Sequence, residues 1–406
     1  MNKLFLSILA IVIASICNAQ YKNDNVAFKT VYTQDLCNEF SKQPGYILLD
    51  VRTKGEYEDT STRGLNVGRF KEAKNIEVSE LGNRIKELSA YKDMPVFVYC
   101  SHSQRSRRAS KMLADSGFTK VFNINGGMTG VQQLPLEGNE CVFNQLTTKH
   151  NYKMMSADEF CKRLSGNRSN IVVLDVRDDS SYDHISSDAK KNAYGTFKGA
   201  IHFTMNDLAM GKYNTLVGKE VIVIDLFGDE ADKAAEFLVQ HNITNVSVLL
   251  EGVDRMLHNN NKGLTCMQSD YISPVKFNIV STQQLQDWMK MNPGYVFLDV
   301  RTKEEFENKH KNYWQNIGRL QNAINLPSTD LAQQLSTIEN YKNKPIMIYT
   351  FGSNTSAFEA AYSLVANGFT NVSVLKGGLF NVGWTAANIK GYSALANLRV
   401  DVPDNQ

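Results

Sequence analysis

A single cysteine stands where an apolar, strand-like run stops, in the segment "VYCSHSQRSRRASKML" (98–113). Cys100 follows that run, Arg105 comes five residues later, and a helical pattern then begins. A short loop between a strand and a helix start turns backbone N–H groups inward and favours negative charge. These N–H groups, the helix dipole and Arg105 favour the thiolate, which is the nucleophilic form of cysteine. The segment therefore predicts a nucleophilic thiolate in an anion-binding loop.

The rest of this loop is polar and could contact a substrate. The predicted substrate-binding residues are Arg105, Ser101, His102, Ser103, Gln104 and Ser106. Arg105 would hold an anion by charge-assisted hydrogen bonds. His102, at the loop tip, either stabilises the thiolate, touches substrate or faces water. Arg107, Arg108 and Lys111 could attract anions, but the favoured interpretation is that they form the solvated face of the helix. The alternative interpretation of Cys100 is a small hydrophobic core residue without a chemical role.

The surroundings of Cys100 occur three times in the 406-residue chain. "YILLDVRTKGEYE" (46–58), "IVVLDVRDDSSYD" (171–183) and "YVFLDVRTKEEFE" (295–307) are one motif, and their aspartates lie 125 and 124 residues apart. A period of this length is too long for a solenoid and indicates tandem domains. We expect a leader at 1–19 and domains at 28–148, 149–273 and 274–395.

Each repeat alternates short β-branched runs with helical stretches. This order predicts an α/β fold in which each domain is a parallel β-sheet flanked by helices on both faces. In such sheets ligands bind beyond the carboxyl ends of the strands. Cys100 is expected at that edge, because it follows the run 96–99 directly.

The second and third repeats lack the reactive residues. Asp225 and Thr350 stand at the cysteine position, and Glu230 and Thr355 replace the arginine. The second loop, "DLFGDEA", carries three carboxylates that would repel anions. In the third, "TFGSNTS", a threonine hydroxyl without a nearby base is a poor nucleophile. We expect only the first repeat to be reactive.

The "DVR" motif is present in all three repeats, including the two without cysteine. Asp50 and Arg52 are therefore predicted to form a structural ion pair near the strand end, close to the site but outside the chemistry. The same reasoning covers Gly126–Gly127 and their counterparts at 377–378, which are expected to permit a tight turn beside the loop.

In these motifs the chain resembles the rhodanese superfamily of sulfurtransferases, and the resemblance covers nearly all of residues 28–395. The resemblance implies that Cys100 opens a six-residue loop and takes a sulfane sulfur from thiosulfate, polysulfide or a persulfide. Cys100 would hold this sulfur as a persulfide and pass it to a thiophilic acceptor such as cyanide or a thiol. Bacterial single-domain members often have Cys-x-x-Gly-x-Arg-Ser, whereas this chain has Ser103 at the glycine position. In two-domain members the active domain is usually C-terminal, but here it is first.

Two other functions compete with sulfur transfer. One is a non-enzymatic persulfide carrier, redox sensor or protein-binding protein, in which the inactive repeats provide scaffold or contact a protein partner. The other is a phosphatase or arsenate reductase of the same fold, which needs Cys-x5-Arg. Only four residues separate Cys100 from Arg105, so that loop is one residue too short. No cofactor or metal is expected.

The net charge and the N-terminal segment indicate which partners and which cellular location to expect. A net charge of +2 gives no case for a nucleic-acid partner. "MNKLFLSILAIVIASICNAQ" is typical of a secretory signal peptide cleaved after Ala19, and its apolar run of about 13 residues is short of the roughly 20 that a membrane span needs. We expect an exported, periplasmic or extracellular protein without a membrane span. Lipidation at Cys17 is the less favoured alternative.

The remaining cysteines come in pairs. Cys37 and Cys161 lie early in the first helix of the first two repeats, Cys141 and Cys266 lie in the segments that leave them, and the third repeat has none. Two cysteines that form a disulfide are expected to be present together or absent together in a repeat. Export would take the protein through an oxidising compartment, where disulfides form. We predict Cys37–Cys141 and Cys161–Cys266, with Cys141–Cys161 as the rival pairing. The favoured pairing leaves Cys100 as the free thiol.

Overall fold

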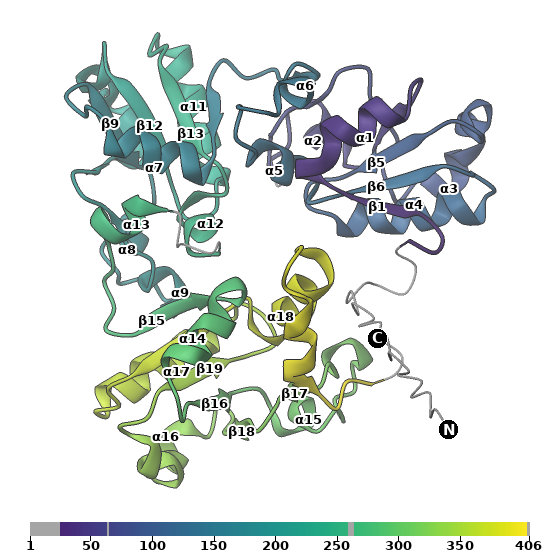
Figure 1. Ribbon diagram of the computed structural model, residues 1–406. Helices are drawn as coiled ribbons and strands as arrows, with labels where there is room; N and C mark the ends of the chain where they lie inside the picture. Colours follow the sequence, from purple (N-terminus) through teal and green to yellow (C-terminus); the bar gives the residue numbers. More distant parts are fainter. Residues whose placement is uncertain (1–24, 63–64, 259–263, 404–406) are drawn as a thin grey trace, which may run out of the picture.

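The computed structural model describes residues 25–62, 65–258 and 264–403, so the expected signal peptide and Cys17 lie outside the described residues. Figure 1 shows three lobes placed around a centre, with the first domain in purple and blue, the second in teal, and the third in green and yellow. Among the described residues, no helix combines the length and apolar character that crossing a bilayer requires.

The first domain is a five-stranded parallel sheet in the order β1-β6-β5-β2-β4. Its strands are β1 (Lys29–Tyr32), β2 (Ile47–Asp50), β4 (Lys74–Asn75), β5 (Val96–Tyr99) and β6 (Val121–Asn125). An antiparallel ribbon joins β3 (Arg69–Phe70) to β7 (Leu146–Thr147). The helices are α1 (Leu36–Lys42), α2 (Lys54–Tyr57), α3 (Leu81–Arg84), α4 (Gln104–Asp115), α5 (Gly127–Gln132) and α6 (Glu140–Phe143), with 3-10 turns η1 (Thr33–Asp35) and η2 (Ile85–Tyr91).

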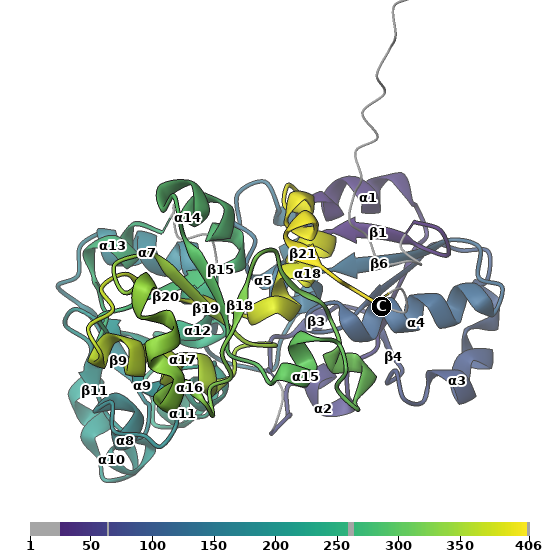
Figure 2. The same ribbon diagram turned by 90° about the horizontal axis from the view of Figure 1, so that it is seen from below.

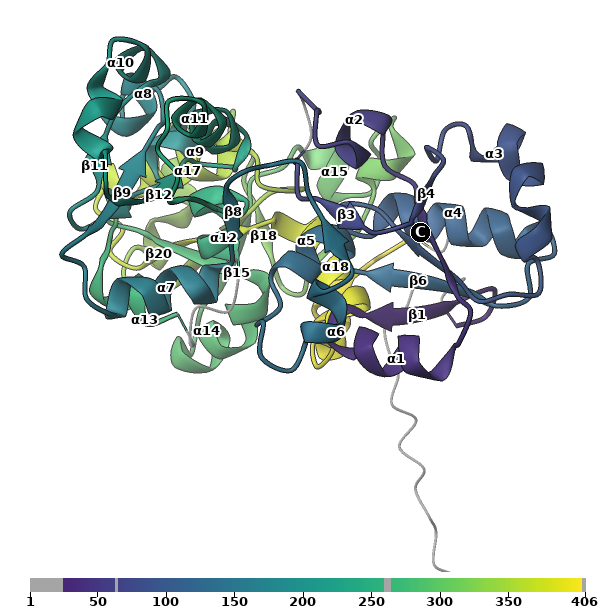
Figure 3. The ribbon, with the colours of Figure 1, turned by 90° about the horizontal axis from the view of Figure 1, so that it is seen from above.

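The side chains of β5 explain why this strand is central. Phe97 and Tyr99 point into an aromatic core under α1, α5 and α6, whereas Val96 and Val98 point into an aliphatic core under α3 and α4. Alternate residues of a strand face opposite sides of the sheet, so an apolar run is buried on both faces when helices cover both. Figure 3 shows α1 and α4 on opposite sides of β6 and β1.

The second domain repeats this architecture with the strand order β8-β13-β12-β9-β11. Its strands are β8 (Lys153–Met155), β9 (Ile171–Asp175), β11 (Ile201–His202), β12 (Glu220–Ile224) and β13 (Val246–Leu249), with a ribbon of β10 (Thr196–Phe197) and β14 (Tyr271–Ile272). Its helices are α7 (Ala157–Ser165), α8 (Asp179–Tyr182), α9 (Ala189–Asn192), α10 (Met205–Ala209), η3 (Lys212–Leu216), α11 (Asp229–Gln240), α12 (Gly252–His258) and α13 (Thr265–Ser269).

The third domain has the order β15-β20-β19-β16-β18. Its strands are β15 (Asn278–Ser281), β16 (Val296–Asp299), β18 (Ile324–Asn325), β19 (Ile346–Tyr349) and β20 (Val372–Lys376), with a ribbon of β17 (Arg319–Leu320) and β21 (Arg399–Val400). Its helices are η5 (Thr282–Gln284), α14 (Leu285–Met291), α15 (Lys303–Phe306), η6 (Tyr313–Gln315), α16 (Leu331–Gln334), η7 (Leu335–Tyr341), α17 (Thr355–Ala366), α18 (Gly378–Asn388) and η8 (Ser393–Leu398). Three parallel sheets, each flanked by helices, confirm the predicted α/β fold in three tandem copies.

Strand register confirms that the three loops are equivalent. In each domain the motif aspartate lies opposite the last residue of the central strand: Asp50 with Tyr99, Asp175 with Ile224, and Asp299 with Tyr349. Cys100, Asp225 and Thr350 come immediately after these central strands, at the carboxyl edge of each sheet.

Helix α18 brings the third domain against the first. Figures 2 and 3 both show it beside β6, although about 260 residues separate the two elements in sequence. The Asn125 side-chain amide donates to the Asn388 carbonyl at 2.7 Å, and Arg107 Nη2 donates to Asn388 Oδ1 at 2.6 Å. Lys376, fully buried, binds the Asp254 carboxylate of the second domain at 2.8 Å. The edges that carry the three loops therefore face one another.

Candidate active site

Cys100 is fixed by its position between two packed elements. It follows β5 and is 2% exposed. Its carbonyl accepts a hydrogen bond from Met128 N at 2.9 Å, so the loop rests on the start of α5. A Cβ at Gly127, which has φ +56°, would lie 2.3 Å from the Cys100 carbonyl oxygen. Glycine is needed here because the backbones touch, in keeping with the structural role expected for the Gly126–Gly127 pair.

A serine hydroxyl lies beside the thiol. Cys100 Sγ lies 3.6 Å from Ser106 Oγ, which is itself 2.7 Å from Asn123 Oδ1. Ser103 Oγ donates to Asn125 Oδ1 at 2.7 Å. The Ser103 backbone has φ 171°, which is extended conformation open to any residue. Serine thus fits the loop without the glycine that the bacterial pattern places there.

Arg105 is joined to a residue that sequence reasoning missed. Its Nη1 and Nη2 donate to the two Glu56 carboxylate oxygens at 2.6 and 2.7 Å, and Ser101 Oγ donates to the same carboxylate at 2.7 Å. Burial alone would raise the pKa of Glu56, but the hydrogen bonds from Arg105 and Ser101 more than offset it and hold that pKa at about 2. Arg105 still lines the cavity beside Cys100. The positive charge of Arg105 is therefore shared between Glu56 and any anion that binds in the cavity.

A local signal for Glu56 does exist in the sequence. Thr53 caps α2, and its side chain and that of Glu56 form a capping box. Glu305 forms the same box with Thr302 in the third domain. The pattern Thr-x-x-Glu indicates a helix start only. It gives no sign of Arg105, which is 49 residues from Glu56 and meets it through the fold.

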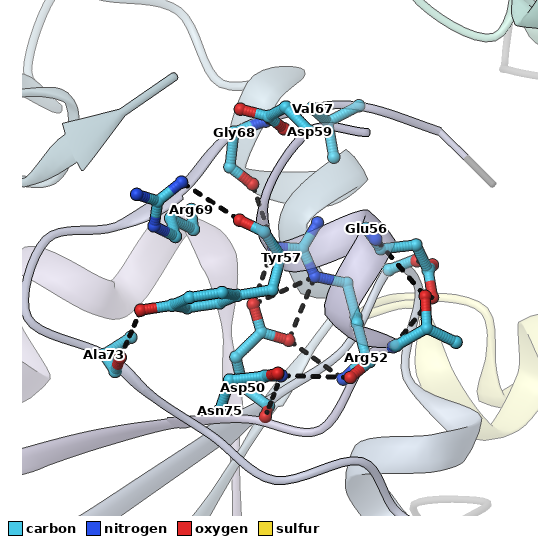
Figure 4. A network of polar contacts seen from close by, with 12 residues as sticks. Asp50, Arg52, Glu56, Tyr57, Asp59, Val67, Gly68, Arg69, Ala73 and Asn75 are labelled. Atoms are coloured by element: carbon cyan, nitrogen blue, oxygen red, sulfur yellow. Dashed lines mark hydrogen bonds and ion pairs between the residues drawn. The ribbon is translucent and has the colours of Figure 1, made fainter. Parts of the chain in front are cut away.

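Asp50 and Arg52 form the buried ion pair expected of them. Both side chains are fully buried, and Arg52 Nη2 lies 2.6 Å from Asp50 Oδ2 and 2.9 Å from the Gly68 carbonyl oxygen (Figure 4). The equivalent pairs in the other domains are 2.7 and 2.6 Å long. In Figure 4 the Asn75 side chain lies beside this pair, and its amide donates to the Asp50 carbonyl at 3.1 Å. The pair ties the end of β2 to the following segment, and neither member lines the cavity at Cys100.

All three domains line one cavity of about 630 Å³ at Cys100. The first domain contributes the loop residues Cys100, His102, Ser103, Gln104 and Arg105. The second contributes Glu251 and α12, and the third contributes α18 with Trp384 and the following Lys390. His102 Nε2 lies 2.9 Å from Glu251 Oε1 across the domain boundary. The second and third domains therefore form walls of the cavity, which no local sequence pattern could reveal.

The loop of the second domain is filled by its own carboxylate. Asp225 Oδ1 accepts a hydrogen bond from Gly228 N at 2.5 Å, and Oδ2 accepts from Glu230 N and Ala231 N at 2.8 and 3.1 Å. Burial raises the pKa of Asp225 to about 6 despite these bonds, so the group is an anion at neutral pH. In the third domain Thr350 Oγ1 donates to the Gly352 carbonyl at 2.7 Å. Neither loop has a thiol at this position.

The cysteines are paired as favoured from the repeats. Disulfides join Cys37 to Cys141 and Cys161 to Cys266, and Cys100 is the free cysteine of the described residues. Each bond connects the first helix of a domain to its exit segment. Over the same residues, no cluster of His, Cys, Asp and Glu has the composition of a metal site.

Comparison with known proteins agrees with this geometry. The family model of the rhodanese-like domain matches residues 33–134, 156–258 and 281–386, and the chain belongs to this family three times over. The family is one of sulfurtransferase type, and its three copies here differ in the loop residues described above.

Two relatives by sequence each match about a fifth of the chain. A Bacillus subtilis protein, YqhL, is 38% identical over 80 residues, covering 20% of this chain and 56% of YqhL. The tRNA uridine(34) hydroxylase of Cytophaga hutchinsonii is 33% identical over 92 residues, covering 21% of this chain and 27% of the hydroxylase. The chain thus spans about half and a quarter of these two relatives. Among solved structures, the thiosulfate sulfurtransferase of Pseudomonas aeruginosa aligns over 87% of this chain and 67% of its own at 17% identity, with a TM-score of 0.23.

Proposed function

We propose that the protein is an exported sulfurtransferase that carries a sulfane sulfur as a persulfide on Cys100. The Cys100 thiolate attacks the outer sulfur of a donor such as thiosulfate. A sulfur–sulfur bond forms to Cys100, the donor's own sulfur–sulfur bond breaks, and sulfite leaves with the electron pair. An acceptor nucleophile then attacks the outer sulfur, and the Cys100 thiolate is the leaving group.

The observation that carries this proposal is the position of Asp225. Its carboxylate oxygens stand two bonds beyond Cβ and accept three backbone N–H groups, those of the third, fifth and sixth residues after it. The outer sulfur of a cysteine persulfide also stands two bonds beyond Cβ and carries negative charge. The corresponding N–H groups at Cys100 belong to Ser103, Arg105 and Ser106. Asp225 is therefore an internal analogue of the persulfide anion in an equivalent loop, which supports a cradle of this kind at Cys100.

Donor selection is proposed to rest on the same loop. Arg105 and the N–H groups favour small sulfur anions, because hydrogen bonds to charged groups are about twice as strong as neutral ones. Ser101 orients the Glu56 carboxylate that holds Arg105, and Gln104 lines the cavity. Domains two and three, within the proposed boundaries 149–273 and 274–395, shape the acceptor side of the cavity.

Export is proposed from two independent features. The N-terminal segment has the basic, apolar and small-residue order of a signal peptide. Two disulfides join residues of the described chain, and such bonds persist in oxidising compartments.

Mass spectrometry tests the proposed chemistry. After incubation with thiosulfate and removal of excess reagent, the intact protein should gain the mass of one sulfur atom, located on the Cys100 peptide. The Cys100→Ser variant should gain none, and it should lose transfer to cyanide, because a hydroxyl neither ionises nor accepts a sulfane sulfur at neutral pH. Wild-type turnover by Cys100→Ser would place the nucleophile elsewhere. A persulfide that forms but never turns over would identify a carrier instead.

A further inference from the structure

Glu251 occupies a backbone position that the other two domains give to glycine. It precedes Gly252 as Gly126 precedes Gly127 and Gly377 precedes Gly378, and all three first residues have positive φ: 97° at Gly126, 59° at Glu251 and 85° at Gly377. A side chain is disfavoured in this left-handed region, whereas glycine enters it freely. A non-glycine residue kept in such a conformation points to a use for its side chain.

The side chain of Glu251 reaches into the loop of the active domain. Its Oε1 lies 2.9 Å from His102 Nε2, and its other oxygen lies 3.5 Å from Arg255 Nε on the next turn of α12. Burial would raise the pKa of Glu251, but Arg255 and His102 offset this and hold it at about 2. The group is therefore a carboxylate at neutral pH, and it can only accept hydrogen bonds.

This contact selects one tautomer of the neutral His102 ring. Since the carboxylate accepts, Nε2 carries the proton, and in the neutral imidazole Nδ1 keeps the lone pair. The His102 side chain is 54% exposed and lines the same cavity as Cys100, two residues away. A ring held by a carboxylate through one nitrogen, with the other nitrogen basic, is the arrangement that serves general-base catalysis.

The other charged groups that line the cavity do not compete for this role. Arg105, Arg255 and Lys390 carry cationic side chains, and Asp254 binds Lys376. The remaining histidine, His258, lies 2.9 Å from Lys376 Nζ and 3.0 Å from Asn381 Nδ2, and burial lowers its pKa to about 3. With both of its nitrogens engaged, it is not available to a substrate.

We propose that His102 is the general base that deprotonates a thiol acceptor, and that Glu251, supplied by the inactive second domain, positions it. The inference rests on the proposed Cys100 persulfide. The acceptor is a small organic thiol, R–SH. His102 Nδ1 takes its proton, the thiolate R–S⁻ attacks the outer sulfur of Cys100–S–S⁻, and the Cys100 sulfur leaves with the bonding electron pair. The proton on His102 neutralises the thiolate that departs, so the products are the organic persulfide and free Cys100.

The size of the effect has a physical ceiling. A thiol with an ordinary pKa of about 8.5 is about 1% ionised at pH 6.5, so a base that supplies the thiolate can gain at most about 100-fold there. Near pH 9.5 most of the thiol ionises unaided, and the gain should vanish. An acceptor that is already ionised at pH 6.5 should show none at either pH.

The experiment isolates the discharge step. Protein is loaded with thiosulfate, freed of reagent, and mixed in single turnover with cysteine or with the ionised aromatic thiol 2-nitro-5-thiobenzoate. His102→Gln should slow discharge to cysteine about 10- to 100-fold at pH 6.5 and less than about 2-fold at pH 9.5. Discharge to the aromatic thiol should change less than about 2-fold. Glu251→Gly, which restores the residue of the other two domains, should move the cysteine rate in the same direction and by less, while the melting temperature stays near that of the wild type.

Controls separate catalysis from domain docking. Arg107→Ala breaks a contact between the first and third domains without removing His102 or Glu251, and it should leave the ratio of the two discharge rates unchanged. Equal losses for both acceptors in His102→Gln, or unchanged rates for both, would overturn the proposal. Failure of the wild-type protein to load sulfur would instead refute the proposed function itself.

Discussion

Arg105 and Glu56 form a bidentate pair, with nitrogen–oxygen distances of 2.6 and 2.7 Å. The arginine was expected to serve the substrate, but it also balances a carboxylate that is 5% exposed. A charge left unpaired in such a place is costly, whereas removing both partners is often nearly neutral. The two roles of Arg105 can therefore be separated by changing one residue or both.

Arg105→Ala should lower both stability and donor use. It leaves the Glu56 carboxylate buried without its cation, and an unsatisfied buried group should cost about 2 kcal/mol of unfolding free energy. Loss of a charge-assisted hydrogen bond, about 1.5–3 kcal/mol, should reduce kcat/KM for thiosulfate about 10- to 100-fold. The double variant Arg105→Ala, Glu56→Gln should recover stability and not thiosulfate use. Recovery of both, or equal losses with a sulfane-sulfur donor that carries no charge, would make Arg105 purely structural.

Glu56→Gln alone should have a pH-dependent cost. The pKa of Glu56 is held near 2 in the folded protein and returns to about 4.3 when the chain unfolds. A lowered folded-state pKa stabilises the fold above the unfolded-state value, and this contribution is lost as pH falls from about 5 to 2. The variant should be less stable than the wild type by about 2–3 kcal/mol at pH 7, and the gap should shrink towards pH 3. Urea denaturation of both proteins at the two pH values measures this gap, and a constant gap would contradict the assignment.

Asp225→Ala should uncover an anion site in the second domain. The N–H groups of Gly228, Glu230 and Ala231 lose their acceptor, and each buried unsatisfied group costs about 1–3 kcal/mol before water repairs part of it. Formate, added to the solution, supplies the carboxylate group that the substitution removes. It should raise the melting temperature of Asp225→Ala and leave that of the wild type unchanged. Equal responses in the two proteins would show that the cradle is closed.

Repetition explains what the sequence could predict. The three domains, the equivalent loops, the Asp50–Arg52 pair and the disulfide partners all follow from comparing one repeat with the next. The contacts that complete the site do not repeat. Glu56 meets Arg105 across 49 residues, and Glu251 meets His102 across 149 residues and a domain boundary. Such contacts depend on how the folded domains dock, which neither periodicity nor local motifs encode.

The position of Ser103 illustrates a second limit. The loop pattern of bacterial relatives suggests a positive-φ glycine there, and the second domain does have Gly228 at φ 98°. At Ser103 the backbone is extended instead, and the buried hydroxyl binds Asn125. Backbone conformation in a six-residue loop is therefore set by local hydrogen bonds that differ between copies of one fold.

The disulfides should stabilise the first two domains and leave the third unaffected. Each closes a loop of more than 100 residues, with separations of 104 and 105, and in the chain-entropy model such a loop contributes roughly 4–5 kcal/mol. The double variant Cys37→Ser, Cys141→Ser removes the disulfide of the first domain. The double variant Cys161→Ser, Cys266→Ser removes that of the second domain. Calorimetry should show a lower transition temperature for the altered domain only, and a reductant should lower the transition temperatures of the wild type towards those of the variants.

Peptide mapping tests the pairing itself. Under non-reducing conditions peptide mapping of exported protein should give Cys37–Cys141 and Cys161–Cys266, with Cys100 alone open to alkylation. A Cys141–Cys161 peptide, or five alkylated cysteines, would refute the pairing and with it the argument that Cys100 is kept free for chemistry.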